Sequence, residues 1–97
     1  MTQLKPPHPG EFIRDVYLTP FDISARRLAV SLCVSPSTLS RLLNGTSDIK
    51  PIMALRLSKA LGRSPESWQA MQRRYDLWVA RNTVNLDGIE PLDFEAA

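Results

Sequence analysis

The chain has 97 residues, of which 43% are hydrophobic, and its formal net charge is +2. This length is enough for one domain with a modest core and too short for two. The longest apolar runs have only four residues, which excludes a membrane-spanning segment and a secretion signal, so we expect a cytoplasmic protein without a membrane partner.

The basic and acidic residues are unevenly distributed. All 12 Lys and Arg residues lie within residues 1–82, whereas residues 83–97 contain four acidic residues and no basic one. A basic body favours a polyanionic partner, although solvated basic surfaces are common. We expect a flexible N-terminal arm over residues 1–8, a helical domain over residues 9–82 and an acidic tail over residues 83–97.

The first predicted helix follows the irregular, proline-rich arm. Pro9 suits the first position of a helix, and Glu11 places an acid where the helix dipole favours one. Apolar residues then recur at helical spacing until Thr19 and Pro20 end the pattern. We therefore expect a helix that begins at Pro9 and ends before Thr19.

Two short helices are predicted next, joined by a turn of about three residues. Ser24 can cap the first, over residues 25–32, and Ser35 with Pro36 can begin the second, which ends near Gly45. The residues able to lock two steeply crossing helices together are Leu28, Ala29, Leu32, Val34, Leu39 and Leu42. This pattern is typical of a helix-turn-helix, here over about residues 24–45, whose second helix enters the DNA major groove.

The outer face of the second of these helices favours DNA binding. Ser37, Arg41 and Asn44 point away from the predicted core, Thr38 and Ser40 lie on the flanks, and none of them is acidic. Hydroxyl groups with one Arg and one Asn are residue types that approach phosphates and base edges. The alternative is an ordinary solvated helix face, which would more often mix Glu with Lys.

The fourth helix is predicted over residues 51–61, with an apolar stripe formed by Ile52, Leu55 and residues 57–61. The fifth and longest helix begins after the Ser64 cap and runs to about Asn82. The tail then contains "VNLDGIEPLDF", in which residues 87–88 could turn a short hairpin. A tail that is disordered, or ordered only by a partner, is an equally good interpretation.

The fifth helix is apolar on two sides. One face carries Trp68, Met71, Tyr75 and Trp78, and the opposite face carries Ala70 and Leu77. We expect Trp68 and Met71 to close the domain's own core. A helix with a second apolar side must bury that side elsewhere, which favours an interface.

The single cysteine and the single histidine do not form a chemical site. One Cys cannot make an internal disulfide, and Cys33 with His8 has no recognisable metal-ligand spacing, so we expect no metal, no cofactor and no enzyme. The predicted helix-turn-helix resembles that of the phage-repressor (XRE) family, in which this turn often takes a left-handed glycine. Cys33 departs from that pattern, and its packing between Ala29 and Leu39 would offset the strain. Redox sensing by the thiol is the alternative interpretation.

Three separated segments resemble the HigA (VapI) antitoxins, which carry a helix-turn-helix of the phage-repressor (XRE) type. They are "HPGEFIRDVYL", "MALRLSKALGRSPESW" and "QRRYDLW", and they flank "SARRLAVSLCVSPSTLSRLLNG", which resembles the helix-turn-helix itself. The resemblance covers about residues 8–82. It implies an all-α, lambda-repressor-like fold of five helices, with a long C-terminal helix and a short tail.

The resemblance implies that the DNA-facing residues are Ser35, Pro36, Ser37, Thr38, Arg41 and Asn44. Ser37 and Arg41 are then the candidates for base contacts. Phosphate contacts are expected from Ser35, Thr38, Ser24, Ala25 and Lys50, because free amides at a helix N-terminus favour anions. Arg26 and Arg27 fit phosphate contacts and a solvated surface equally well.

The family pairs two protomers through its C-terminal helices, so the resemblance implies a homodimer formed by about residues 65–82. Its interface candidates are Arg74, Tyr75, Leu77, Trp78 and Arg81. The implied function has two parts: neutralisation of a HigB-like, mRNA-cleaving toxin, and repression of its own operon through palindromic double-stranded operator DNA. The toxin could bind the N-terminal arm with the first helix, or the acidic tail. The alternative is a stand-alone repressor of the XRE type without a toxin.

Overall fold

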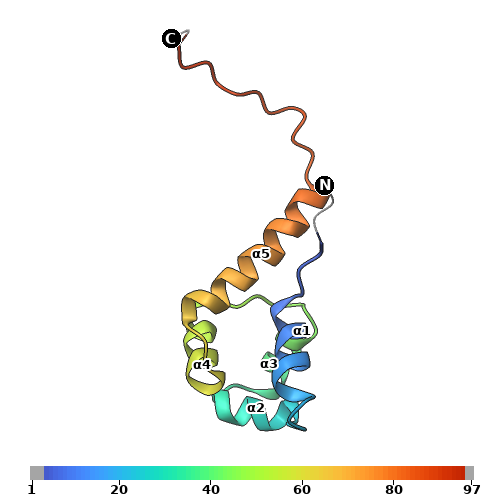
Figure 1. Cartoon of the computed structure of the whole chain (residues 1–97), viewed down its shortest axis with the longest axis vertical. Helices are drawn as coiled ribbons and strands as arrows, with labels where there is room; N and C mark the ends of the chain where they lie inside the picture. The colour runs from blue at the N-terminus through green and yellow to red at the C-terminus, as the bar shows by residue number, and fades with distance from the viewer. Residues whose placement is uncertain (1–3, 96–97) are drawn as a thin grey trace.

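The computed structural model describes residues 4–95 and contains five α-helices (Figure 1). They are α1 (Pro9–Ile13), α2 (Ala25–Leu32), α3 (Pro36–Leu43), α4 (Pro51–Leu61) and α5 (Pro65–Thr83), and a π-helical turn, η1 (Arg14–Leu18), continues α1. The predicted all-α, five-helix fold is therefore confirmed. In the described part of the chain no helix is long and apolar enough to cross a membrane.

Three serine caps set the starts of α2, α3 and α5. The hydroxyl oxygens of Ser24, Ser35 and Ser64 each accept a hydrogen bond from the backbone N–H three residues later, over 3.0–3.1 Å. These bonds satisfy amides that would otherwise lack a partner at a helix start. The sequence predicted these starts correctly because the cap and the following residues act locally.

The core lies between the five helices: α3 packs against α1 and α2, α4 packs against α2 and α5, and α1 also contacts α5. Its fully buried side chains include Ile13, Leu39, Leu57 and Trp68. Gly10 brings α1 against the backbone of α3, because a Cβ atom there would overlap the carbonyl oxygen of Leu42. This close approach holds the first helix against the helix predicted to read DNA.

His8 is part of the folded domain, although the sequence placed it in the irregular arm. Its side chain is only 6% exposed, and its Nδ1 accepts a hydrogen bond of 2.9 Å from the backbone N–H of Gly10. His8 therefore caps α1, and its ring lies against Gly45 and Tyr75. Residues 1–3 of the expected arm lie outside the described residues.

The predicted apolar stripe of α4 is partly wrong. Ala54 and Leu57 are buried, but Ile52 and Leu55 are 69% and 60% exposed. At about 100° per residue, positions 52 and 55 point away from the side that carries 54 and 57. The apolar stripe predicted from the sequence therefore combined residues from two different faces of the helix.

The first half of α5 joins the core as expected, since Trp68 and Met71 are buried. The indole Nε1 of Trp68 donates a 2.9 Å hydrogen bond to the carbonyl oxygen of Gly62, just after α4. Gln72 is also buried, and its Oε1 accepts a 2.9 Å bond from the backbone N–H of Ile49. These bonds fasten α5 to both ends of α4.

The tail leaves the end of α5 and runs away from the helical body (Figure 1). Residues 84–95 contain no strand, so the hairpin that the sequence allowed is wrong, and Asp87 and Gly88 form only an isolated turn. A hairpin needs two strands with a face to bury, and the apolar side chains of this segment are exposed instead.

Candidate nucleic-acid interface

The turn between α2 and α3 is held by hydrogen bonds from both sides. Cys33 adopts the left-handed conformation, with φ 56° and ψ 43°, and the backbone N–H of Val34 donates to the carbonyl oxygen of Ala29 over 3.1 Å. From α4, the Nη1 of Arg56 donates to the carbonyl oxygen of Leu32 over 2.7 Å. Carbonyl groups at the end of α2 are therefore satisfied by the turn and by α4, and the chain turns sharply into α3.

The backbone at Cys33 is as predicted, but the predicted packing of its side chain is wrong. The residue is exposed, so its thiol is not packed between Ala29 and Leu39. Ala29 and Leu39 themselves are buried, at 1% and 0% exposed. The left-handed strain at Cys33 is therefore not offset by burial.

The start of α3 presents a cluster of three hydroxyl groups. The Oγ of Ser35 donates to the Oγ1 of Thr38 over 2.8 Å and lies 3.2 Å from the Oγ of Ser37. Ser35, Pro36 and Ser37 are exposed and Thr38 is half-buried. Short hydroxyl side chains beside the positive end of a helix dipole form a surface suited to anions.

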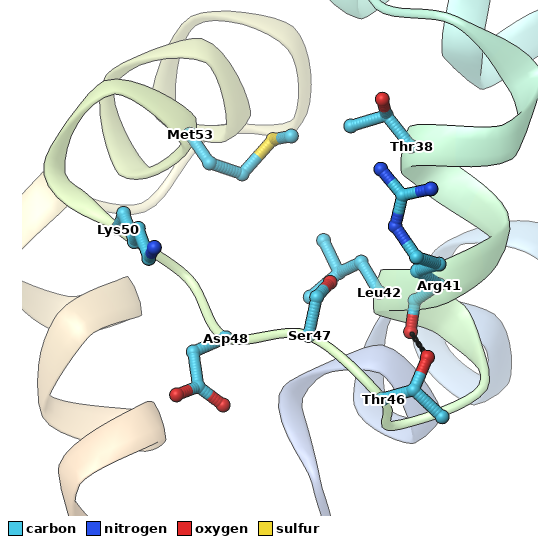
Figure 2. A pocket seen from close by; sticks show the side chains of 8 residues that line it. All are labelled: Thr38, Arg41, Leu42, Thr46, Ser47, Asp48, Lys50 and Met53. Atoms are coloured by element: carbon cyan, nitrogen blue, oxygen red, sulfur yellow. Dashed lines mark hydrogen bonds between the residues drawn. The ribbon is translucent and has the colours of Figure 1, made fainter.

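A recess of about 480 Å³ separates α3 from the start of α4. Figure 2 shows Thr38 and Arg41 of α3 on one side of it, Met53 and Lys50 at the start of α4 on the other, and the loop through Ser47 below. Arg41 and Lys50 are both exposed. The recess thus carries two cations placed on separate elements.

The one acid that lines this recess is turned away from Arg41. Figure 2 shows the carboxylate of Asp48 pointing to the opposite side of the loop, where its Oδ1 accepts a 3.3 Å hydrogen bond from the Nε2 of Gln72. The recess therefore keeps a positive character that a polyanion requires. Buried Gln72, which sets the position of Asp48, gave no recognisable signal in the sequence.

Asn44 lies at the other end of α3 and is held in place by two neighbours. Its Oδ1 accepts a hydrogen bond of 3.4 Å from the Nη2 of Arg14, and its Nδ2 donates to the Oγ of Ser40 over 3.3 Å. Arg14 also lines a recess of about 360 Å³ together with Ala25 of α2. Arg14, which the sequence did not single out, therefore connects the end of α3 with the start of α2.

The residues expected at a dimer interface are only partly brought together. Arg74, Leu77, Trp78 and Arg81 line one groove of about 200 Å³ with Leu4 and Pro6 of the arm. Tyr75 is turned toward its own domain, where its ring meets His8 edge-on with centroids 4.9 Å apart. The Nζ of Lys5 lies 5.6 Å from the centroid of the Trp78 ring. The arm therefore forms one wall of this groove.

Comparison with known proteins identifies the fold. Residues 13–68 match the family model described as helix-turn-helix. The chain is 39% identical to virulence-associated protein I of Dichelobacter nodosus, over 92% of this chain and 83% of that protein. It is 37% identical to antitoxin HigA-1 of Vibrio cholerae, over 84% of this chain and 76% of that protein.

A solved structure gives the same result in three dimensions. The Pseudomonas aeruginosa antitoxin HigA, determined with the higBA promoter, superposes with a TM-score of 0.81 and 37% identity. The match covers 91% of this chain and 99% of that one. The chain has the helix pair and the exposed α3 surface described above, and it matches these relatives over most of its length. It therefore belongs to the HigA family of helix-turn-helix antitoxins.

Proposed function

We propose that this protein is an antitoxin that represses its own operon as a DNA-bound homodimer and neutralises a HigB-like toxin that cleaves mRNA. It acts in the bacterial cytoplasm and is not an enzyme. The observation that carries the DNA-binding part is the surface of α3, where Ser37 and Arg41 are exposed beside a hydroxyl cluster and a second cation, Lys50. The related Pseudomonas protein bound to promoter DNA supports the same assignment.

The proposed DNA contacts divide into two classes. Ser37 and Arg41 read base edges in the major groove, since Arg can donate two parallel hydrogen bonds to guanine. Phosphates are held by Ser24 and Ala25 at the start of α2 and by Ser35, Thr38 and Lys50, whereas Pro36, which has no backbone N–H, and Asn44 only face the DNA. Contacts of this second class fix the position of α3 without reading sequence.

The proposed homodimer places two copies of α3 on one palindromic operator. Half-sites about 34 Å apart, one turn of B-DNA, let both copies enter the major groove from the same side. Arg74, Leu77, Trp78 and Arg81 are the candidate interface residues, since Leu77 is 50% exposed despite being apolar. Tyr75 contributes indirectly, through its contact with His8.

The proposed neutralisation of a toxin rests on the family, because two of the relatives, HigA-1 of Vibrio cholerae and HigA of Pseudomonas aeruginosa, are antitoxins. A ribonuclease that acts on mRNA presents basic residues to its substrate. An antitoxin neutralises such an enzyme by covering that surface or by distorting it.

Co-expression with the adjacent open reading frame tests the function directly. We expect a basic gene product of about a hundred residues to arrest growth when expressed alone, to be tolerated with this protein, and to co-purify with it. As a control, the Arg41→Ala variant should still rescue growth, because it changes the DNA surface only. If no adjacent product arrests growth or co-purifies, the toxin part is refuted and a stand-alone repressor is left.

A further inference from the structure

The acidic tail carries an exposed set of apolar side chains. Leu86, Ile89, Leu92 and Phe94 are 59%, 70%, 76% and 83% exposed. Acids alternate with them at Asp87, Glu90, Asp93 and Glu95, and no base occurs after Arg81. A segment with this many solvent-exposed apolar groups is typical of a docking peptide that is ordered by the surface it binds.

The groove beside Trp78 has the complementary chemistry. Leu4, Pro6, Leu77 and Trp78 supply its apolar surface, and Arg74 and Arg81 supply cations along the same helix. Lys5 adds a third cation over the Trp78 ring. At about 200 Å³ the groove is smaller than a typical small-molecule site and has the size of a pocket for side chains of an extended peptide.

The geometry of the tail points to a groove on another molecule. The tail continues outward from the end of α5 (Figure 1). The groove is lined by residues of the preceding turns of the same helix. To reach its own groove the chain would have to reverse direction within a few residues of Thr83. Continuing outward, it is free to meet a second copy.

We propose that the tail of each protomer binds the Trp78 groove of the other, with Leu86 and Ile89 entering the apolar part and Asp87 and Glu90 facing the cations. Each chain has one tail and one groove, so the exchange is reciprocal and closes with two-fold symmetry. The exchange rests on the proposed homodimer and specifies how its C-terminal ends are joined.

Full-length variants test the exchange by sedimentation equilibrium. Leu86→Ser with Ile89→Ser should weaken the dimer at least about tenfold, because two apolar side chains lose their burial. Arg74→Glu in the groove should weaken it in the same direction through charge repulsion. The matched control is Val30→Ser on α2, which is 73% exposed and should leave the dissociation constant unchanged.

Mixing the tail variant with the Arg74→Glu variant separates exchange from folding back. In each variant homodimer, every tail-to-groove contact has one altered partner. In the mixed dimer, the intact tail of the Arg74→Glu variant can bind the intact groove of the tail variant, so one of the two contacts is restored. We therefore expect the mixture to associate more tightly than either variant alone. Equal weakness of the mixture would mean that each tail binds its own groove, and this would overturn the proposal.

A tail variant that dimerises like the wild type would also overturn the exchange while leaving the homodimer intact. If that variant instead failed to bind the co-expressed toxin, the tail would serve the toxin and the proposal would be wrong. A wild-type chain that remains monomeric would refute the homodimer itself. Circular dichroism of each variant confirms that the helices are retained, as expected for substitutions at exposed positions.

Discussion

The imidazole ring of His8 meets the ring of Tyr75 edge-on, with centroids 4.9 Å apart and an interplanar angle of 81°. The same imidazole accepts a hydrogen bond from the backbone N–H of Gly10 and lies 3.7 Å from the position of a Cβ atom on Gly45. His8 therefore joins three parts of the fold: the start of α1, the loop after α3 and the middle of α5.

This position makes stability depend on pH. Burial lowers the pKa of His8 below its ordinary value of 6.5, and nearby oxygens oppose the shift only in part. These opposing groups are the carboxylates of Asp48, Asp76 and Glu11 and the backbone of Ser47. The unfolded chain therefore takes up the proton first as the pH falls, so the free energy of unfolding should decrease below about pH 6.5 and level off once the folded His8 is protonated.

The matched variant is His8→Asn, which keeps an oxygen acceptor for the cap and removes the titrating group. Urea unfolding of both proteins at a series of pH values should show a steeper loss for the wild type over the range below 6.5. If the free energy of unfolding fell equally with pH in the two proteins, His8 would not contribute to the pH dependence of stability.

Arg41→Ala should weaken operator binding by about 1–3 kcal/mol and broaden the sequence preference, because a base contact is lost. The melting temperature should stay nearly the same, since Arg41 is exposed. Lys59→Ala is the charge-matched control, because it also removes one exposed cation. Lys59 lies in the last turn of α4, whereas Lys50 lies at the start of that helix. Fluorescence anisotropy at fixed salt measures both, and equal losses for the two variants would exclude a base contact by Arg41.

Ser35→Ala should lower the free energy of unfolding by about 1 kcal/mol, because the N–H of Thr38 loses its cap. Ser64→Ala removes the equivalent cap from α5, where Ser64 accepts from the N–H of Ser67 over 3.0 Å. We expect similar losses of stability from both variants, but a loss of operator affinity only from Ser35→Ala. Equal operator affinity for the two variants would place Ser35 outside the DNA interface.

Cys33→Gly should raise the free energy of unfolding by up to about 1 kcal/mol, since glycine adopts the left-handed conformation without a Cβ penalty. Cys33→Ser, which keeps the Cβ atom, should leave stability close to that of the wild type. Chemical unfolding compares the three proteins. A Cys33→Gly variant that is less stable than Cys33→Ser would show that the thiol makes a packing contact.

The sequence was sufficient for features set by neighbouring residues. Ser24, Ser35 and Ser64 act on amides three positions away, so the starts of α2, α3 and α5 could be placed from local pattern alone. The left-handed turn at Cys33 was instead predictable from the resemblance to the phage-repressor family, which often has glycine at this position. The resemblance carried by residues 8–82 then supplied the family.

Features that depend on distant contacts were not predictable in this way. His8 reads as part of a proline-rich arm until Gly45 and Tyr75 surround it. Gln72 and Arg56 look like ordinary surface residues, yet their hydrogen bonds span 23 and 24 positions of the chain. The stripe of α4 failed because apolar residues on both of its faces satisfy a loose helical spacing.

Footprinting of the DNA upstream of this protein's gene shows whether α3 places the protein on its own operator. We expect protection of a palindrome whose half-site centres are about 10 base pairs apart. The Arg41→Ala variant should lose that protection at protein concentrations where the wild type protects fully. An absence of any protected site, or the same footprint from both proteins, would show that α3 does not read the operator.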